Sequence, residues 1–458
     1  MELYSTIAAI STPYGTGGIS IIRISGSNAV EIADRIFAPS SGRMLKDVPT
    51  HTIHHGRVVG RDGKMIDEVL VSVMLAPRTY TGEDVVEINC HGGLVVTKSV
   101  LEEVFAAGAV QASPGEFTKR AFLSGRMDLC EAEAVIDVIN SKTSLEHSVS
   151  VNHLSGALSD KINHIRSRLL SLIANVQVLI DYPDEGLESL SDEEFLDTLK
   201  EIGKDIAKLY ATSETGRLIR SGISSVIAGK PNVGKSSLLN LLAGSNRAIV
   251  TDTPGTTRDV IEEYISFGNV TLRLADTAGI RKTDDEVESI GVNLSYEYLR
   301  KCDLVIFMAD ATRGLDDEDM DVISSIGNKK RIALINKCES GSKISKDELE
   351  KYFDTCIEFS VKDEIGVTDL ENAISSMFEM GEIAQSCDGI ITNSRHRDAL
   401  YKAGQAVNGA ITAIESGIPV DTTFIDLENA VASMGEIVGL TVAEEIVDKI
   451  FHSFCVGK

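Results

Sequence analysis

A glycine-rich segment of the chain has the residue types and the spacing that bind a chain of phosphates. Residues 229–236 read GKPNVGKS, which matches GxxxxGK[ST], and they lie between a β-rich run and the apolar segment SLLNLLAG. Glycines allow a tight backbone cradle whose N–H groups bind phosphate oxygens, the lysine adds positive charge, and the hydroxyl can ligate Mg²⁺. The expected nucleotide contacts are Asn232, Val233, Gly234, Lys235, Ser236 and Ser237.

A second candidate for the same site follows the strand-like run VTLRLA. It consists of Asp276, Thr277, Ala278 and Gly279. An aspartate at the end of a strand can hold magnesium through water, and a glycine lets a backbone N–H approach a terminal phosphate. Such a motif is more often a simple turn when it occurs alone, but its order after the phosphate loop favours the nucleotide site.

Two further motifs are of the kind that recognises a base. Asn336-Lys337-Cys338-Glu339 follows RIALI, and Ser360-Val361-Lys362 follows CIEFS. This order resembles the translation-factor-like GTPases, in which an NKxD element reads guanine and an SAK-like turn contacts the base. Glu339 stands where that family usually has aspartate, so the site must accommodate one extra methylene.

The loop before these strands suggests how hydrolysis proceeds without a catalytic glutamine. Ile280 follows the DTAG motif, and a hydrophobic side chain cannot orient a water. The polar loop TDTPGTTRD has hydroxyls and carbonyls that suit a hard cation, and a monovalent ion could replace an arginine finger. The alternative is a mobile polar loop without such a role. The residues concerned are Thr251, Asp252, Thr253, Pro254, Gly255, Thr256 and Thr257.

The elements that must position these motifs divide the 458 residues into segments of different pattern, and a length of about 150 residues per domain suggests three domains. Residues 1–120 show β-type alternation at 17–26 and 68–77 and a helical segment at 97–108, which predicts an α/β domain. Helical spacing marks 121–218 and returns at 382–458, with long helices expected at 396–414 and 440–451. Strands alternate with helices in 219–381, which predicts a mainly parallel sheet inserted in a discontinuous helical domain.

Composition restricts the class of protein and its compartment. With 43% hydrophobic and 25% charged residues the chain is typical of a globular protein, and no apolar run approaches the roughly 18 residues of a membrane span. The start MELYSTIAAISTPYG lacks the features of a signal peptide, and seven scattered cysteines without a CxxC pair predict reduced thiols, so a cytoplasmic protein is expected. The histidines at 51, 54, 55 and 91, with Cys90, fit no zinc signature and are expected to be strand and turn residues.

The net charge of -25, from 44 basic and 69 acidic residues, should repel polyanions unless basic groups cluster locally. If this chain meets nucleic acid, its front segment or a partner must contribute.

Three stretches point to one family: TPYGTGGISIIRISG, SPGEFTKRAFLSGRMDLCEAEAVIDVI and the terminal FCVGK. Together with the inserted GTPase motifs, they closely resemble the tRNA wobble-uridine modification GTPases, the MnmE (TrmE) family, over essentially the whole chain. The resemblance implies a homodimeric, potassium-activated GTPase. It also implies an N-terminal α/β domain that binds tetrahydrofolate and dimerises, a central helical domain, and an inserted Ras-like P-loop GTPase domain.

The resemblance also implies partners and a reaction. An FAD-dependent MnmG-type protein would form a hetero-oligomer with this chain. Together they would add a carboxymethylaminomethyl or aminomethyl group to carbon 5 of the wobble uridine of certain tRNAs, from a tetrahydrofolate one-carbon unit. Because the chain is acidic, tRNA would bind mainly through the complex.

Residue roles carried over from the family are assigned by position. Potassium would be bound by Asn232, Thr251, Thr253 and Thr256, and magnesium by Ser236 and Thr257. The folate positions are Arg23, Glu83, Arg126 and Lys458. Glu288 matches the glutamate that orients the attacking water, and Cys455 is the candidate reactive thiol. Without the resemblance, Glu288 would be one more carboxylate of an acidic helix and Cys455 an ordinary thiol.

Two other functions are alternatives to this one. A regulatory GTPase switch for assembly or ribosome association would need neither folate nor the terminal cysteine. A stand-alone folate aminomethyltransferase would leave the whole middle domain without a role.

Overall fold

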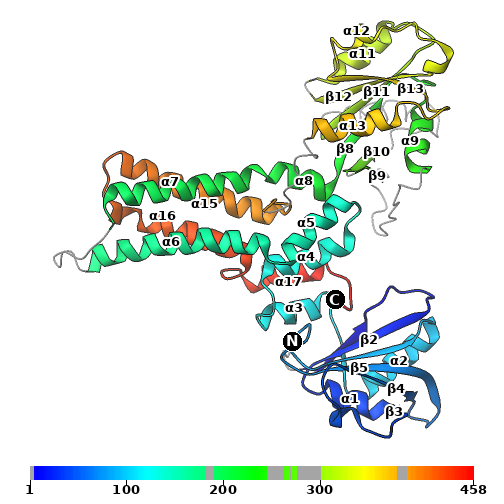
Figure 1. Ribbon diagram of the computed structural model, residues 1–458, viewed down its shortest axis with the longest axis vertical. Coiled ribbons are helices and arrows are strands. Elements are labelled where there is room, and N and C mark those ends of the chain that lie inside the picture. The colour runs from blue at the N-terminus through cyan, green and yellow to red at the C-terminus, as the bar shows by residue number, and fades with distance from the viewer. Residues whose placement is uncertain are drawn as a thin grey trace, which may run out of the picture. The chain divides into compact units, whose positions relative to one another are not determined.

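The computed structural model describes residues 5–181, 190–244, 262–268, 270–275, 301–327, 329–378 and 389–458. The chain divides into two compact units (Figure 1). Unit 1 comprises Met1–Ile136 and Gly435–Lys458, and unit 2 comprises Asp137–Met434. Each unit is described by itself.

Unit 1 contains a seven-stranded sheet in the order β3-β4-β5-β6-β2-β1-β7. The parallel pair is β1 with β7, and the other neighbours are antiparallel. The strands are β1 (Ile7–Ile10), β2 (Ile19–Ser25), β3 (Phe37–Pro39), β4 (Thr52–Val59), β5 (Met65–Met74), β6 (Val85–His91) and β7 (Val110–Gln111). The alternating segments expected at 17–26 and 68–77 are therefore strands, because side chains of period two place one face in a core.

Two helices cover one face of this sheet. Apolar residues of α1 (Ala29–Ile36) and α2 (Leu94–Ala106) share a buried cluster with strand residues such as Ile22, Val71 and Ile88. A 3₁₀ turn, η1 (Leu45–Asp47), lies beside α1. The helix expected at 97–108 begins three residues earlier, at Leu94.

The remainder of unit 1 is helical and includes the C-terminal segment. A second cluster joins Phe122, from α3 (Glu116–Leu123), and Leu129, from α4 (Leu129–Asn140), to Phe451 of α17 (Glu444–His452) and to Phe454. The helix expected to start at 440 starts at Glu444 instead. The preceding helix ends at Val438 and is followed by Gly439, whose φ of +88° is typical of a helix C-terminus. The end of the chain is thereby packed against the segment that follows β7.

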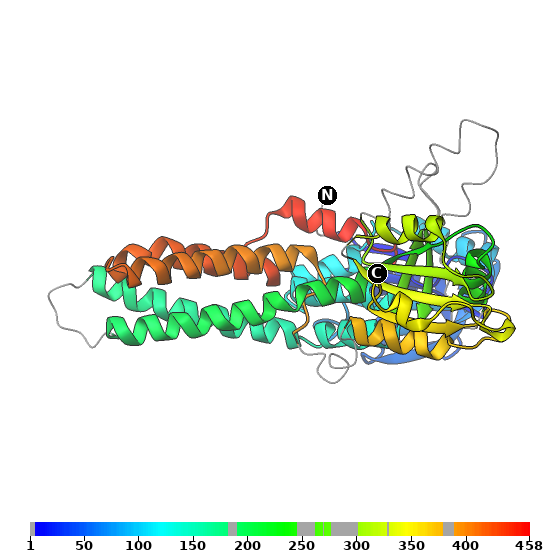
Figure 2. The same cartoon turned by 90° about the horizontal axis from the view of Figure 1, so that it is seen from above.

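Unit 2 contains a helical bundle built from both helical stretches of the sequence. Figures 1 and 2 show its long helices side by side. They are α6 (Ala157–Asp181), α7 (Asp192–Ala211), α15 (Ser394–Glu415) and α16 (Phe424–Val438), with η3 (Val420–Thr423) before α16. Two shorter helices, α5 (Ser144–Leu154) and α8 (Ser213–Ser221), belong to the same helical part of the unit. At Gly203 of α7 and Gly404 of α15, an added Cβ would lie 3.4 Å from Val407 and 3.5 Å from Ile206, respectively, which is ordinary van der Waals contact, so α7 and α15 pack directly against each other here.

The inserted part of unit 2 is a six-stranded sheet in the order β13-β12-β11-β8-β10-β9. All neighbours are parallel except β10 and β9, as the expected mainly parallel sheet requires. Its strands are β8 (Ile223–Ala228), β9 (Glu262–Phe267), β10 (Val270–Ala275), β11 (Leu304–Asp310), β12 (Lys330–Asn336) and β13 (Thr355–Phe359). Its helical elements are α9 (Lys235–Gly244), α11 (Asp317–Ser325), η2 (Cys338–Ser340), α12 (Lys346–Leu349) and α13 (Val367–Met377).

Both faces of the central strands are buried, which explains why β11 reads as a continuous apolar run. Within the described residues, no helix is both long and apolar enough to cross a membrane.

Candidate functional site

The phosphate loop connects β8 to α9 in a conformation that few side chains allow. Gly229, Asn232 and Gly234 have φ values of +139°, +67° and +111°. A Cβ at Gly229 would lie 2.4 Å from the Met308 carbonyl oxygen, and one at Gly234 would lie 2.4 Å from Asn336 Nδ2. The two glycines are therefore needed both for their backbone angles and for the contact with β11 and β12.

The loop ends at the N-terminus of α9, a position that favours an anion because the first N–H groups of a helix have no acceptor within the helix itself. Lys235 Nζ donates hydrogen bonds to the carbonyls of Gly229 and Lys230, each at 2.6 Å. The hydroxyl residues Ser236 and Ser237 follow and are exposed, whereas Val233 is buried. The positive charge and the hydroxyls thus lie together at the helix start, as the motif predicts.

A second lysine of the phosphate loop, which was not predicted from the sequence, forms ion pairs with acidic residues at the start of α11. Lys230 is 6% exposed and forms ion pairs with Asp316, with Glu318 at 3.2 Å and with Asp319 at 3.5 Å, at the start of α11. Burial alone lowers the pKa of Lys230, but its hydrogen bonds to Asp316 and Glu318 raise it overall. Lys230 therefore remains a cation that ties the loop to α11.

The motif at the end of β12 connects the phosphate loop to the turn after β13. Asn336 is 3% exposed; its Nδ2 donates to the Val233 carbonyl at 2.8 Å, and its Oδ1 accepts from the Val361 N–H at 3.2 Å. The buried Ser360 accepts a hydrogen bond from the Asp363 N–H at 3.1 Å. The Asn336 side chain therefore connects its own motif to the phosphate loop, through Val233, and to the turn after β13, through Val361.

Lys337 adds a further contact to the phosphate loop. Its Nζ lies 2.5 Å from Asp310 Oδ2 at the end of β11 and donates to the Asn232 carbonyl at 3.4 Å. Burial alone raises the pKa of Asp310, but Lys337 and Thr312 lower it overall. Cys338 is partly buried, whereas Glu339 and Lys362 are exposed. The side chains of Glu339 and Lys362 are thus accessible on the surface.

The remaining nucleotide and metal residues predicted from the sequence lie outside the described residues. They are Thr251, Asp252, Thr253, Pro254, Gly255, Thr256, Thr257, Asp276, Thr277, Ala278, Gly279 and Glu288.

Unit 1 contains a second polar cluster, centred on Arg23 of β2. Arg23 Nε and Nη2 contact Glu87 Oε1 at 2.9 and 2.8 Å, and Arg23 Nη1 donates to the Gly457 carbonyl at 3.4 Å. Its guanidinium carbon lies 5.4 Å from the ring centroid of Tyr80 and 5.6 Å from that of Phe117. Arg23 is thus held between two aromatic rings and a carboxylate, in a geometry that favours cation–π attraction.

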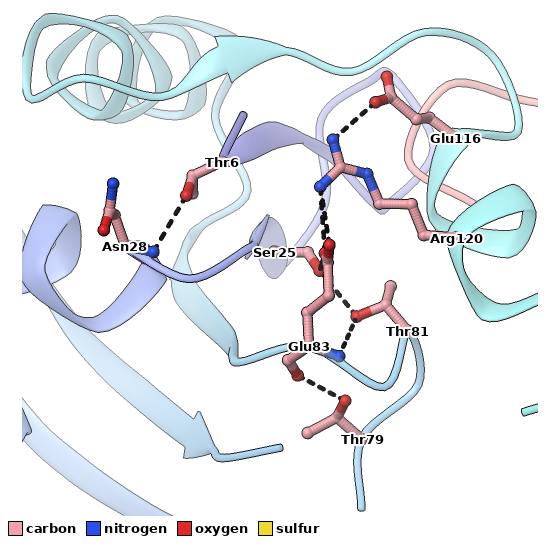
Figure 3. Close-up of polar contacts among 8 residues, drawn as sticks. All are labelled: Thr6, Ser25, Asn28, Thr79, Thr81, Glu83, Glu116 and Arg120. Atoms are coloured by element: carbon pink, nitrogen blue, oxygen red, sulfur yellow. Dashed lines mark hydrogen bonds and ion pairs between the residues drawn. The ribbon is translucent and has the colours of Figure 1, made fainter. Parts of the chain in front are cut away.

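Glu83 is held by a network from three separate segments (Figure 3). Arg120 Nη1 donates to both oxygens of the Glu83 carboxylate, each at 3.1 Å. Ser25 Oγ donates to the same carboxylate at 2.8 Å and lies 2.7 Å from Thr81 Oγ1. Arg120, 6% exposed, also donates to Glu116 Oε1 at 2.9 Å. The orientation of the Glu83 carboxylate is therefore fixed.

Arg120 is not among the residues predicted from the sequence. The spacing of Glu116 and Arg120, four residues apart in GEFTKR, is a helical ion-pair pattern that could have indicated it.

Three other residues predicted from the sequence belong to unit 1: Lys458, Cys455 and Arg126. Lys458 follows Gly457, whose carbonyl accepts from Arg23; burial lowers the pKa of the Lys458 ammonium, Arg23 lowers it further, and Glu87 opposes them. Cys455 is exposed, and its carbonyl accepts from the Gly115 N–H at 3.3 Å. Arg126 is exposed in the turn after α3, and the arginine that binds Glu83 is Arg120. The structure thus brings Arg23, Lys458 and the backbone of Cys455 into one region.

Replacing Arg120 with alanine should destabilise unit 1 strongly. The change leaves Glu116, 13% exposed, without this partner, and breaking a buried pair costs about 3 kcal/mol of unfolding free energy. Chemical denaturation followed by a probe in unit 1 measures this. The control is Lys98→Ala, because Lys98 is 70% exposed and its partner Glu102 is 59% exposed, so this pair should contribute less than about 1 kcal/mol. Equal losses in both variants would contradict the structural role of Arg120.

The parallel sheet, the phosphate loop between β8 and α9, and the Asn336 turn define the inserted domain as a P-loop nucleotide-binding domain of the GTPase class. Residues 129–455 match the family model described as the MnmE helical domain. Residues 6–126 match the family model described as the GTP-binding protein TrmE N-terminus. The chain therefore belongs to the tRNA modification GTPase MnmE family.

Full-length relatives agree with this assignment. The tRNA modification GTPase MnmE of Clostridioides difficile (strain 630) is 45% identical over 460 residues, covering 100% of both chains. That of Acetivibrio thermocellus is 47% identical over 456 residues, covering 99% of both. Among solved structures, the G domain of the T. maritima FeoB iron transporter is 25% identical, covers 34% of this chain and 98% of its own, and has a TM-score of 0.27.

Proposed function

We propose that this chain hydrolyses GTP and that it takes part in modifying the wobble uridine of certain tRNAs. One observation carries the proposal: a single chain contains both the phosphate loop joined to Asn336 and a separate unit in which Arg23, Lys458 and Cys455 lie in one region. Relatives of the same length that are named tRNA modification GTPases support it.

In the proposed reaction, unit 2 binds the triphosphate. The Lys235 ammonium exchanges its two carbonyl partners for phosphate oxygens, and the first N–H groups of α9 donate to the same phosphates. The exposed Ser236 hydroxyl at the start of α9 fits a magnesium ligand, with Thr257 as the second, and the magnesium would neutralise charge that develops on the phosphates. Glu288 is proposed to orient the attacking water.

Potassium and guanine selectivity belong to the same proposal. The Asn232 side chain is exposed on the phosphate loop, where an amide oxygen fits a monovalent cation, with Thr251, Thr253 and Thr256 as the other proposed ligands. Asn336, Lys337 and Glu339 are proposed to recognise guanine. The exposure of Glu339 supports this, because an exposed side chain has room to place its extra methylene.

Unit 1 is proposed to bind a tetrahydrofolate derivative. A pterin presents N–H donors, which the fixed Glu83 carboxylate can accept, and its anionic tail suits the Arg23, Lys458 and Arg126 cations. The carboxylate of Glu83 accepts three hydrogen bonds and has capacity for about four, so it can still accept from a ligand. Cys455 is the proposed reactive thiol.

The assembly follows from the same assignment. We propose domains at 1–120, 121–218 with 382–458, and 219–381, a cytoplasmic homodimer, and an FAD-dependent MnmG-type partner that supplies most of the tRNA contacts. Ile19, Ile53 and Leu70 are 66%, 67% and 46% exposed on the sheet face opposite α1 and α2, which supports a homodimer through unit 1. The net charge of -25 supports a partner for tRNA.

Nucleoside analysis of tRNA from cells that lack this protein tests the proposal. We expect the modified wobble uridine to disappear and to return on expression of the wild-type chain.

A comparison of salts tests the role of potassium. The purified chain should hydrolyse GTP at least about tenfold faster in potassium than in sodium, because potassium is the cation proposed to replace the arginine finger. An unchanged nucleoside profile would favour the regulatory switch, and equal rates in the two salts would remove potassium from the mechanism.

A further inference from the structure

In the last five residues of unit 1, two exposed residues lie between two buried ones. Phe454 is 5% exposed, and its ring centroid lies 5.3 Å from that of Phe451 in the apolar cluster of α3, α4 and α17. Cys455 and Val456 are exposed, and Gly457 is buried again. The chain is therefore anchored on both sides of an exposed pair that includes the candidate thiol.

Donors from three distant segments hold this anchor. Ser11 Oγ donates to the Gly457 carbonyl at 3.0 Å, and Arg23 Nη1 donates to the same oxygen at 3.4 Å. The Gly115 N–H donates to the Cys455 carbonyl at 3.3 Å. Two side chains thus converge on one carbonyl, and a backbone amide fixes the residue that carries the thiol.

The anchor also requires glycine at position 457. Gly457 has a φ of +100°, and a Cβ there would lie 2.1 Å from the Ile10 carbonyl oxygen and 3.0 Å from the Ser11 Cα. These are backbone atoms, so they cannot move aside as the end of a flexible side chain can. Any other residue would push the segment away from Ser11 and Arg23.

We propose that Ser11 is a positioning residue, which together with Arg23 clamps the Gly457 carbonyl and so fixes the segment from Cys455 to Lys458. The catalytic use of Cys455 rests on the proposed function, whereas the clamp rests on the contacts above. Arg23 then has a structural task in addition to its proposed contact with folate. In this arrangement the Cys455 side chain is presented to solvent while its backbone stays fixed.

Hydrogen exchange of the full chain tests the clamp. The reporters are the Gly115 amide, which bonds to the Cys455 carbonyl, and the Lys458 amide. Ser11→Ala removes one hydrogen bond and should speed exchange of both by about fivefold to tenfold. Gly457→Ala should abolish their protection, and Ser11→Thr, which keeps the hydroxyl, should keep exchange near wild type.

Two variants separate the clamp from general effects. Ser453→Ala removes a hydroxyl that donates to the Ile450 carbonyl at 2.6 Å, on the same segment but away from Gly457. Gly63→Ala has a comparable φ of +76° with no atom within 4 Å of the added Cβ. Both should leave the two reporter amides unchanged. Unchanged exchange in Ser11→Ala or Gly457→Ala, or equal acceleration in the controls, would overturn the clamp.

Folate titration distinguishes this inference from the proposed function. With 5-formyltetrahydrofolate as the probe, Ser11→Ala should weaken binding and slow tRNA modification by about fivefold, and Ser11→Thr should restore both. A wild-type chain that binds no folate, while exchange responds as expected, would refute the folate assignment and support the clamp. A wild-type chain that binds folate, with exchange unchanged in Ser11→Ala, would do the reverse.

Discussion

Replacing Lys235 with alanine should reduce kcat/KM for GTP hydrolysis by about 10²-fold to 10³-fold, the usual effect of removing one charge-stabilising donor. The lysine lies at the start of α9 with Nζ 2.6 Å from two loop carbonyls, so it already points across the phosphate loop. Its charge is expected to matter most when negative charge develops on the phosphates. Steady-state kinetics on the purified chain measure the loss.

The matched control for Lys235 is Lys351→Ala, because Lys351 is an exposed lysine beyond α12. It should stay within about twofold of wild type, as surface substitutions usually do. Thermal melting of both variants shows whether Lys235→Ala is folded. A folded Lys235→Ala chain with activity within threefold of wild type would refute the phosphate assignment.

The same preparations test base selectivity. GTP should displace a bound fluorescent guanine nucleotide at concentrations at least about 100-fold lower than ATP, since a site built for one base edge leaves polar groups unpaired with another. Displacement by ATP as readily as by GTP would refute guanine selectivity and point to Glu339 as its cause.

Replacing Cys455 with serine should abolish tRNA modification while GTP hydrolysis stays within about twofold of wild type. Serine keeps the size and a hydrogen-bonding group but lacks a nucleophilic thiolate, so only thiol chemistry is lost. The phosphate loop lies in unit 2 and Cys455 in unit 1, which is why the two activities should separate. Nucleoside analysis and a phosphate-release assay measure them together.

Val456→Ala is the control for Cys455, because Val456 is the adjacent residue and is 45% exposed. It should modify tRNA at nearly the wild-type rate. Full modification by Cys455→Ser would reject the thiol as a reactive group. A parallel loss in Val456→Ala would instead assign the effect to the conformation of the segment.

The fold class and the phosphate loop could be read from local sequence patterns. Alternation of period two in β2 and β5 and the GxxxxGK[ST] pattern before α9 are each decided by residues close together in the chain. The parallel sheet followed from strands that alternate with helices. Helix ends were not determined by the pattern: α16 ends at Val438, before Gly439 with its positive φ, and α17 starts at Glu444, neither of which hydrophobic spacing alone reveals.

The partners of the charged side chains were decided by the tertiary structure. Lys230 meets Asp316, Glu83 meets Arg120, and Arg23 meets Gly457, which is 434 residues away. Amino-acid types and spacing determined which chemistry this chain can perform, since backbone geometry and periodicity are local. Folding alone decided which carboxylate neutralises which cation and where the last residues lie, because those energies depend on distances that exist only after sheet and helices have packed.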